Sequence, residues 1–587
     1  MKYSDQIADW LTDLGYTHCF FVTGGNIMHL VESFSHKLTC IPVVHEVAAG
    51  IAVEYFNEVA KRGRALALVT AGPGLTNIVT AMAGAFLESR ELLVLGGQVK
   101  RADLARGEVR QRGVQEVDGV SIAKSVAIQS ALMDEAWTRK QFCNATQAGC
   151  LGRKGPIFLE IPLDVQALDI DSISLNEGAA AKPEELFSPL AESDLEELKS
   201  LIAHAKRPVI LIGGGIARET TDRLMDQLAT LGIPLMVTLH GLDRIYESHP
   251  MFFGRPNIWG QRSANIVQQQ ADLLVALGTR LSLQQTGFNW QEFMPIGKVV
   301  HVDCDPKELH KGHPRVDLAI CGDANKVLDY IVQEVEPNRY KDWVAFCREV
   351  RELVPLDDPQ NKTKKGYLSP YQFCLRLSER AIGDDVVIPC SSGGAYTIMH
   401  QTFQYKRGQR GLHSGALASM GYGLSAAIGA AIASQGKRTI LVEGDGGFLQ
   451  NLQELGTVAM NHLNMKIFLF DNHGYASIRA TQRSYFQGHY VGCDNETGLY
   501  TPRWEKLFAA YDIPLLRITK DFEKEKEFLQ LFSMTGPAGF IVNLDPDQTY
   551  FPKITSRITT NGMESNPLHQ MSPELPPEIA EKVFRYF

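Results

Sequence analysis

The stretch from Gly444 to Asn472 constrains the fold of this chain more than any other. An apolar run ends in Gly444-Asp445-Gly446, and a second apolar run ends in Asp471-Asn472. Between them, apolar residues recur at helical spacing, at Leu449, Leu452, Leu455 and Ala459. This order predicts a strand, a turn, a helix and a second strand, with an oxygen-bearing side chain at the carboxyl end of each strand.

The side chains at these two strand ends predict a metal–phosphate site. Hard divalent cations prefer oxygen ligands, and Mg²⁺ usually keeps substrate phosphate among its ligands. Glycines let backbone N–H groups approach a phosphate, and a helix N-terminus favours its negative charge. A glycine-aspartate-glycine turn alone is common, but the asparagine after the next strand makes the pattern specific. We therefore predict that Asp445 and Asn472 bind a Mg²⁺ ion that carries a diphosphate.

Composition excludes several classes of protein. The net charge is −9 with no basic stripe, which argues against a nucleic-acid partner. Ten cysteines without a CxxC pair predict neither a disulfide framework nor a zinc site. Charges at Lys2 and Asp5 occupy the place where a signal peptide needs an apolar core, and no apolar run approaches membrane-spanning length. We expect a cytoplasmic protein that does not enter a membrane.

The length of 587 residues predicts several domains. Alternation of apolar runs with helical patterns is typical of α/β domains that contain doubly wound parallel sheets. Stretches rich in Pro, Ala, Ser and charged residues at 171–193 and 337–370 read as connectors. We expect three such domains at 1–170, 194–336 and 371–546, followed by a proline-punctuated C-terminal tail at 547–587 that lies over the folded body.

The first and third segments look like copies of one design. Each has a helix of small residues, then a basic turn, an apolar strand and a glycine-containing turn. In the first segment these are 48–60, 63–64, 66–69 and 72–74, and in the third they are 420–433, 436–437, 439–442 and 444–446. Because βα units in general share a similar composition, chance could produce a similarity of this kind between the two segments.

Several motifs occur in an order and spacing that identify a family. They are Gly24-Gly25, His45-Glu46, TAGPGLTN at 70–77, GGQV at 96–99, Gln115-Glu116, GPIFLEIPLDVQ at 155–166, HVDCDPKEL at 301–309, GALASMGYGLSAAIGA at 415–430 and the motif from Gly444 to Asn472. Over nearly its full length the chain resembles the acetolactate synthase-like branch of the thiamine diphosphate (ThDP) enzymes. That family has pyrimidine-binding, central and diphosphate-binding domains, which implies these roles for the three segments in order.

The resemblance implies a set of site residues. Catalytic roles fall to Gly25, Glu46 and Gln115. Contacts with ThDP fall to Glu46, Pro73, Asn77, Gly393, Gly394, Ala418, Met420, Asp445, Gly446, Gly447 and Asn472. The metal ligands are Asp445, Asn472 and the backbone carbonyl of Gly474.

The resemblance also implies what two of these residues do. Glu46 would accept a hydrogen bond from N1′ of the aminopyrimidine, which favours the imino form that removes the C2 proton. Met420 would be a wedge that folds the two cofactor rings together. An isolated glutamate at such a place is as often a surface or helix-capping carboxylate, and a methionine on an apolar helix is more often a core residue.

The central segment carries a weaker signal. Gly213, Gly214 and Gly215 follow an apolar strand, as a nucleotide-binding turn would. Arg280 and Asp303 lie at the ends of two further apolar strands. In acetolactate synthases this domain holds FAD, and in related coenzyme A lyases it holds an ADP moiety. FAD is therefore a candidate ligand of these five residues.

Of three departures from the family pattern, those at Val114 and Thr481 fall near the acceptor pocket. Acetolactate synthases have a phenylalanine where this chain has Val114 and a tryptophan where it has Thr481; the proline of their GLPAA run is Ser425 here. We expect the hydroxyl of Thr481 and the guanidinium of Arg479 to contact a polar or phosphorylated acceptor.

These observations predict a carboligase that requires ThDP and Mg²⁺. It would decarboxylate a 2-keto acid, pyruvate above all, and add the two-carbon unit to a carbonyl acceptor. Segments similar to ThDP proteins of deoxysugar and polysaccharide pathways favour a nucleotide-linked ketosugar as the acceptor. The alternatives are a true acetolactate synthase, a lyase or hydrolase of the 2-hydroxyacyl-CoA or cyclic diketone type, and an inactive nucleotide-binding homologue. The family implies a homodimer or homotetramer with sites at the subunit interface.

Overall fold

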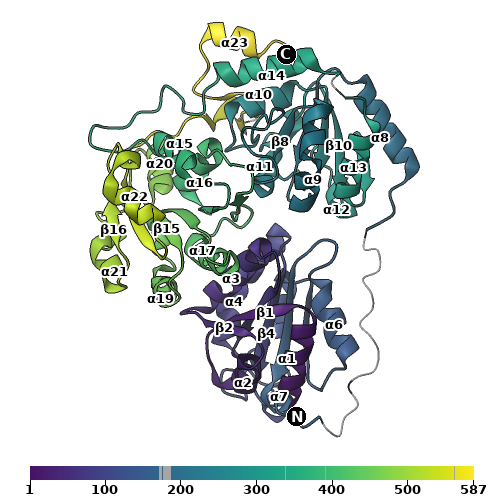
Figure 1. Ribbon diagram of the computed structural model, residues 1–587, viewed down its shortest axis with the longest axis vertical. Helices are drawn as coiled ribbons and strands as arrows, with labels where there is room; N and C mark the ends of the chain where they lie inside the picture. The colour runs from purple at the N-terminus through teal and green to yellow at the C-terminus, as the bar shows by residue number, and fades with distance from the viewer. Residues whose placement is uncertain (171–174, 176–186, 338, 391, 561) are drawn as a thin grey trace.

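The structure is a computed structural model that describes residues 1–587 except 171–174, 176–186, 338, 391 and 561. Three parallel sheets, each flanked by helices, form three α/β domains (Figure 1). The prediction of three doubly wound parallel-sheet domains is confirmed. The first expected connector falls largely outside the described residues.

The first domain is built on a six-stranded sheet with the order β2-β1-β3-β4-β6-β5. Its strands are β1 (Tyr16–Phe21), β2 (Thr39–Pro42), β3 (Arg64–Val69), β4 (Leu92–Gln98), β5 (Gln129–Leu132) and β6 (Pro156–Pro162). Its helices are α1 (Tyr3–Asp13), α2 (Met28–Ser35), α3 (Glu46–Val59), α4 (Pro73–Glu88), α5 (Gly119–Ala123), α6 (Arg139–Ala148) and α7 (Leu163–Gln166). The central strands are buried on both faces, as continuous apolar runs predict.

The central domain has a five-stranded sheet with the order β11-β10-β9-β7-β8. The strands are β7 (Pro208–Ile212), β8 (Leu235–Val237), β9 (Leu273–Leu277), β10 (Lys298–Asp303) and β11 (Leu318–Cys321). The helices are α8 (Glu192–His204), α9 (Arg218–Leu231), α10 (Arg262–Gln270), α11 (Leu283–Thr286), α12 (Pro306–Leu309) and α13 (Ala324–Glu334). Helix α14 (Lys341–Leu353), which lies within the second expected connector, packs on this domain's core.

The third domain has a six-stranded sheet with the order β13-β12-β14-β15-β17-β16. The strands are β12 (Val386–Pro389), β13 (Arg410–Gly411), β14 (Thr439–Gly444), β15 (Met465–Asp471), β16 (Leu515–Arg517) and β17 (Ala538–Asn543). The helices are α15 (Pro370–Arg380), α16 (Gly393–Thr402), α17 (Tyr422–Ala433), α18 (Asp445–Phe448), α19 (Leu455–Met460), α20 (Ala476–Tyr485), α21 (Trp504–Ala510) and α22 (Lys526–Ser533).

The strand orders of the first and third sheets are the same when each is numbered along its own domain. In both, the second strand lies at one edge, the first and third are neighbours, and the fifth lies at the other edge. All the pairings within these two sheets are parallel. The two segments therefore share a topology, as the sequence pattern indicated.

The single helix expected after Gly446 is divided into three pieces. Helix α18 ends at Phe448, a 3₁₀ turn η6 covers Leu452–Glu454, and α19 begins at Leu455. Of the apolar residues at helical spacing, Leu455 is buried and the other three are half-buried against the same core. The break turns the side chains of Asn451 and Glu454 toward other parts of the molecule. Periodicity alone did not reveal the break.

Helices α3 and α17 cross where the first and third domains meet (Figure 1). Both are rich in Ala and Gly, which allows the two backbones to approach closely. A Cβ atom placed on Gly429 would lie 2.0 Å from the carbonyl oxygen of Ala52. At one end of the crossing, the Tyr422 hydroxyl donates a 2.8 Å hydrogen bond to the buried Glu54 carboxylate.

Residues beyond the third sheet run back across the molecule to the central domain (Figure 1). They contain short strands β18 (Lys553–Ile554), β19 (Ser556–Thr559), β20 (Gly562–Ser565) and β21 (Met571–Ser572), and helix α23 (Pro577–Val583). Leu568 and Val583 are fully buried in the core of the central domain. Among the described helices, none has the length and apolar character needed to cross a membrane.

Candidate active site

The turns of the third domain meet at the place where its strand order reverses. Strands β12 and β14 are neighbours, and the chain leaves their carboxyl ends in opposite directions, so a crevice opens between the two turns. Gly393 and Gly394 begin helix α16 after β12, and Asp445 begins α18 after β14. Because β15 is the next strand, Asn472 lies beside Asp445.

Three oxygen atoms converge at this edge. The amide oxygen of Asn472 lies 2.8 Å from the carbonyl oxygen of Gly474 and 3.2 Å from Oδ1 of Asp445. Turning the amide over would replace both contacts by hydrogen bonds from its nitrogen. Neighbouring ligands in an octahedron with Mg–O distances near 2.1 Å lie about 2.9 Å apart. The orientation with the Asn472 oxygen facing Gly474 and Asp445 therefore fits a Mg²⁺ ion.

The chemistry of these donors also suits a hard cation. They are a carboxylate, an amide and a backbone carbonyl, and within the described residues no three His, Cys, Asp or Glu side chains gather as a metal site. The backbone N–H groups of Gly446 and Gly474 both donate 2.8 Å hydrogen bonds to the Asp445 carboxylate, which fixes its orientation. Burial raises the pKa of Asp445 to about 7, and the nearby Asp471 acts in the same direction. Below that pH the Asp445 carboxyl is protonated, so a cation that binds there must displace the proton.

The loop before α17 is held beside the Asp445 turn. The side chain of Asn451 donates a 2.7 Å hydrogen bond to the carbonyl of Gly421. Ala418 has a left-handed backbone with φ +53°, and Met420 keeps 37% of its surface exposed. Met420 is therefore not a core methionine in this chain but presents its side chain at the edge of the crevice.

A second cluster forms at the corresponding edge of the first sheet. Glu46 is the first residue of α3 and is 8% exposed. It accepts a 2.9 Å hydrogen bond from the side-chain amide of Asn77 on α4. Pro73 begins α4 one turn before Asn77. This contact makes Glu46 an oriented, partly desolvated carboxylate rather than a solvated surface group.

Gln115 and Gly25 border the same cluster. Gln115 has φ +65°, and a Cβ on Gly72 would lie 2.3 Å from the Gln115 carbonyl oxygen, so the two backbones touch. The conformation of Gly72, with φ +66°, favours glycine for a second reason. A Cβ on Gly25 would meet no atom within 4 Å, so Gly25 borders open space.

The two clusters are joined by Glu454 of η6. Its carboxylate accepts hydrogen bonds from the backbone N–H groups of Val44 (3.1 Å) and His45 (3.0 Å), directly before Glu46. In the described part of the chain, Glu46 itself makes no hydrogen bond to a residue of the third domain; its partner is Asn77.

The expectation that Arg479 faces the acceptor is wrong. Arg479 is 5% exposed, and its guanidinium donates hydrogen bonds to the carbonyl oxygens of Asn472 (2.6 Å) and His473 (3.0 Å). The helical position turns its side chain inward, where it holds the loop that carries the converging oxygens. Thr481 is exposed and bonds to the carbonyl of Ser477. Val114 is 84% exposed in the single chain.

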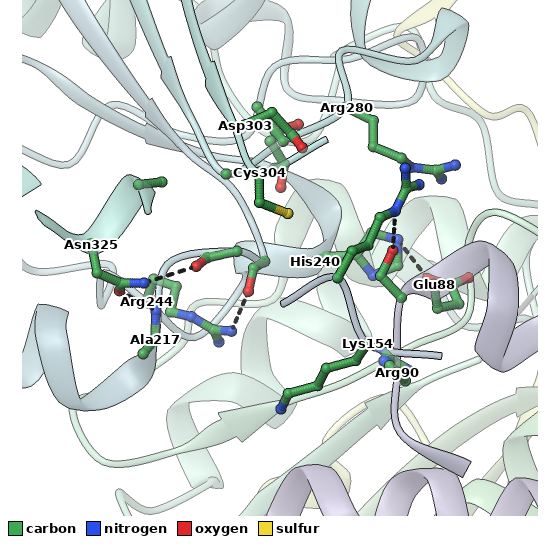
Figure 2. A pocket seen from close by; sticks show the side chains of 18 of the residues that line it. Glu88, Arg90, Lys154, Ala217, His240, Arg244, Arg280, Asp303, Cys304 and Asn325 are labelled. Carbon is green, nitrogen blue, oxygen red and sulfur yellow. Dashed lines mark hydrogen bonds and ion pairs between the residues drawn. The ribbon is translucent and has the colours of Figure 1, made fainter. Parts of the chain in front are cut away.

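A second concave site lies between the first and central domains. This cavity of about 500 Å³ has Gly214, Gly215, Arg280 and Asp303 in its lining, together with Lys154 of the first domain (Figure 2). Gly213 is not in the lining, because its backbone packs against Gly278 and donates to Leu277. Lys154, Arg280 and Asp303, among several charged residues of the lining, are a donor set that fits the phosphates and ribose of a nucleotide.

The wall of this cavity is connected to the loop that leads to Met420. Glu88, at the end of α4, accepts hydrogen bonds from the N–H groups of Gly415 (2.9 Å) and Ala416 (2.8 Å). Its other oxygen lies 2.7 Å from the His240 ring, which faces the cavity (Figure 2). Although burial opposes ionisation, His240 and Arg90 hold the pKa of Glu88 below its usual range.

Sequence reasoning did not identify Asn451, Glu454, Glu88 or Tyr550. The first three hold segments next to site residues, and Tyr550 lies against Gly394 itself. Asn451 and Glu454 are buried polar residues, and the side chain of Glu88 is fully buried. In the sequence, the available signal is a polar residue next to a leucine in a mostly apolar segment. Tyr550 lies in an irregular segment with no periodic pattern, so its position depends on tertiary structure alone.

Comparison with known proteins assigns the three domains. The model of the N-terminal TPP binding domain of thiamine pyrophosphate enzymes matches residues 1–122, that of the central domain matches 195–331, and that of the C-terminal TPP binding domain matches 392–542. The acetolactate synthase isozyme 2 large subunit of Escherichia coli K12 is 29% identical over 547 residues, covering 92% of this chain and 95% of that protein. The acetolactate synthase of Mycobacterium bovis is 30% identical over 533 residues, covering 87% and 82%.

Proposed function

Because the chain belongs to the thiamine pyrophosphate enzymes and is acetolactate synthase-like, we propose that it is a Mg²⁺-dependent carboligase that decarboxylates a 2-keto acid such as pyruvate. The observation that carries the proposal is the joint presence of the Glu46–Asn77 pair and the three converging oxygens of Asp445, Asn472 and Gly474. An inactive nucleotide-binding homologue would have no need to keep both.

Each residue of the candidate site has a separate proposed role. When bound, ThDP supplies a nucleophilic carbon and stabilises the electron pair left by decarboxylation. Glu46, oriented by Asn77, would share a proton with a ring nitrogen of the bound cofactor. Asp445, Asn472 and the Gly474 carbonyl would hold Mg²⁺, and the N-terminus of α16 at Gly393 and Gly394 would bind phosphate oxygens. Met420 would fix the cofactor's folded shape.

The acceptor is proposed to be larger than pyruvate. Val114 and Thr481 are small where acetolactate synthases have aromatic rings, which leaves space for a bulkier carbonyl compound such as a nucleotide-linked ketosugar. The second candidate is a true acetolactate synthase, favoured by the names of the relatives. A C–C lyase or hydrolase uses the same cofactor apparatus and differs only in the substrate.

The cavity between the first and central domains is proposed to hold a nucleotide cofactor, with FAD as the candidate. Lys154 and Arg280 would contact phosphates, and Asp303 would accept hydrogen bonds from ribose hydroxyls. Absorbance of purified protein near the flavin bands, before and after denaturation, tests whether the ligand is a flavin or a nucleotide without that ring.

The test of the proposed function is release of CO₂ from pyruvate in the presence of ThDP and Mg²⁺, with and without a panel of carbonyl acceptors. We expect kcat/KM for a bulky ketone or ketosugar to exceed that for pyruvate as acceptor. If pyruvate or 2-ketobutyrate is better by tenfold, the enzyme is an acetolactate synthase. Absence of CO₂ release with any acceptor would overturn the carboligase assignment in favour of a lyase or hydrolase.

A further inference from the structure

Tyr550 reaches the diphosphate edge of the third domain from the segment that follows β17. The Asn361 side chain accepts a hydrogen bond from the backbone N–H of Phe551 (2.9 Å) and donates one to its carbonyl (2.9 Å). The backbone N–H groups of Lys362 and Lys364 donate to Thr549 and Asp545, respectively. The connector before α15 thus holds this segment on both sides of Tyr550, so the position of the ring is fixed by the fold.

The ring of Tyr550 lies against the beginning of α16. A Cβ placed on Gly394 would be 3.1 Å from Cε1 of Tyr550 and 3.2 Å from its hydroxyl oxygen. A side chain at Gly394 would therefore press against the phenol, which packs closely on the glycine backbone. The hydroxyl consequently lies at the N-terminus of a ten-residue helix, where an anion is favoured.

The same hydroxyl lies close enough to the Asn472 side chain for the amide to influence the pKa of the phenol. The Asn472 oxygen faces the oxygens of Gly474 and Asp445, so its NH₂ group is the one that can donate to Tyr550. With the oxygen of the phenol accepting this bond, its own proton remains to be donated elsewhere. Burial raises the pKa of Tyr550 to about 12, which keeps that proton in place at neutral pH.

We propose that Tyr550 is a positioning residue of the Mg²⁺-diphosphate site: it accepts from the Asn472 amide, which turns the amide oxygen toward the metal, and it donates its own proton to a diphosphate oxygen above Gly393 and Gly394. The proposal rests on the proposed binding of ThDP and Mg²⁺. Tyr550 lies outside the sequence motifs, and the proposal gives it a role in both the metal-binding part and the phosphate-binding part of the site.

The test is Tyr550→Phe, which keeps the ring against Gly394 and removes only the hydroxyl. Tyr405→Phe is the matched control, because Tyr405 is buried in the same domain and its hydroxyl has no hydrogen-bond partner among the described residues. Calorimetry of each protein would measure the Kd of ThDP, and separately the Kd of inorganic pyrophosphate, at saturating Mg²⁺. A hydrogen bond to a charged group predicts a loss on the order of tenfold or more for both ligands in Tyr550→Phe, and no change in the control.

The outcomes separate this inference from the proposed function. If the unmutated protein binds ThDP with Mg²⁺ and Tyr550→Phe binds both ligands equally well, the inference fails while the function stands. A loss for ThDP without a loss for pyrophosphate would also overturn it, because the hydroxyl would then act on another part of the cofactor. If the unmutated protein binds neither ligand, the proposed function itself fails. Without ligand, both variants should keep a cooperative thermal transition, since the ring packing is kept in both.

Discussion

At the residue scale, three of the eleven described non-glycine residues with positive φ lie in the two clusters. Gln115, Ala418 and His473 all have positive φ although none is a glycine. Each such conformation costs on the order of 1–3 kcal/mol and persists only where surrounding contacts impose it. His473 lies between the metal-site residues Asn472 and Gly474, and Arg479 holds its carbonyl. Strain at these places is consistent with a site whose geometry is set before any ligand arrives.

The first prediction concerns Glu46. Glu46→Gln keeps the size of the side chain but cannot hold the proton, so exchange of the C2 proton of bound ThDP should slow on the order of 10²-fold. Deuterium exchange followed by NMR after acid quench measures this directly. ThDP affinity should change little. Glu32→Gln, an exposed carboxylate on α2, is the control; an unchanged exchange rate in Glu46→Gln would assign activation of the cofactor to another group.

At the element scale, the crossing of α3 and α17 depends on the absence of a side chain at Gly429. An added methyl group would overlap the carbonyl of Ala52, and overpacking of this kind costs about 1–3 kcal/mol or more. A substitution at Gly429 therefore tests whether the crossing limits the stability of the first and third domains.

We expect Gly429→Ala to lower the thermal midpoint and to weaken cofactor binding, because the clusters on the two domains would move apart. Gly456→Ala in α19 is the matched control: its Cβ would lie 3.4 Å from Tyr511, an ordinary contact. Replacing a helical glycine there should be neutral or stabilising by up to about 1 kcal/mol. Scanning calorimetry would measure the thermal midpoint of each variant. Equal midpoints would mean that α3 and α17 can separate without a loss of stability.

Elements marked by strong local patterns could be predicted from the sequence. The strands before Asp445 and Asn472, the small-residue helices and the repeat between domains were all anticipated, because buried parallel strands and glycine turns leave direct signals. The break at Asn451 and the inward turn of Arg479 could not be predicted, since both depend on side-chain contacts with loop carbonyl groups, which leave no periodic signal. Tyr550 was missed for the same reason.

At the scale of the whole molecule, a charged network ties the three domains together. Arg218 of α9 lies 3.3 Å from Glu58 of the first domain and 2.7 Å from Asp243. Asp243 also accepts a 3.2 Å hydrogen bond from the N–H of Gly411 in the third domain. Although burial opposes ionisation, Arg218 and Arg244 lower the pKa of Asp243 to about 2.

The lowered pKa of Asp243 predicts that the stability of the protein falls in acid. An unfolded aspartate has a pKa near 3.9, so the stabilisation from Asp243 is present above that pH and is lost as the pH falls toward 2. A shift of roughly two units corresponds to about 2–3 kcal/mol. Arg218→Gln should lower the thermal midpoint at pH 7 and flatten its dependence on pH between about 4 and 2. Arg223→Gln, an exposed position on the same helix, should do neither.

The last prediction concerns assembly. Glu46 and the metal ligands lie on different domains, and in the family the facing domains come from two chains. Inactive Glu46→Gln and inactive Asp445→Ala chains, dissociated and mixed, should regain part of the activity through hybrid sites. Each variant treated alone in the same way is the control. No recovery, with heterodimers verified by mass, would mean that each site is built within one chain.

The return of residues 547–587 to the central domain has a consequence for how the protein is made. Leu568 and Val583 complete the apolar core of a domain whose own strands were translated more than two hundred residues earlier. On the ribosome, the central sheet must therefore wait, with part of its core open to solvent, until this distant segment emerges. A chain released early would expose that surface and be a ready substrate for chaperones and proteases, even though all three sheets had already been synthesised.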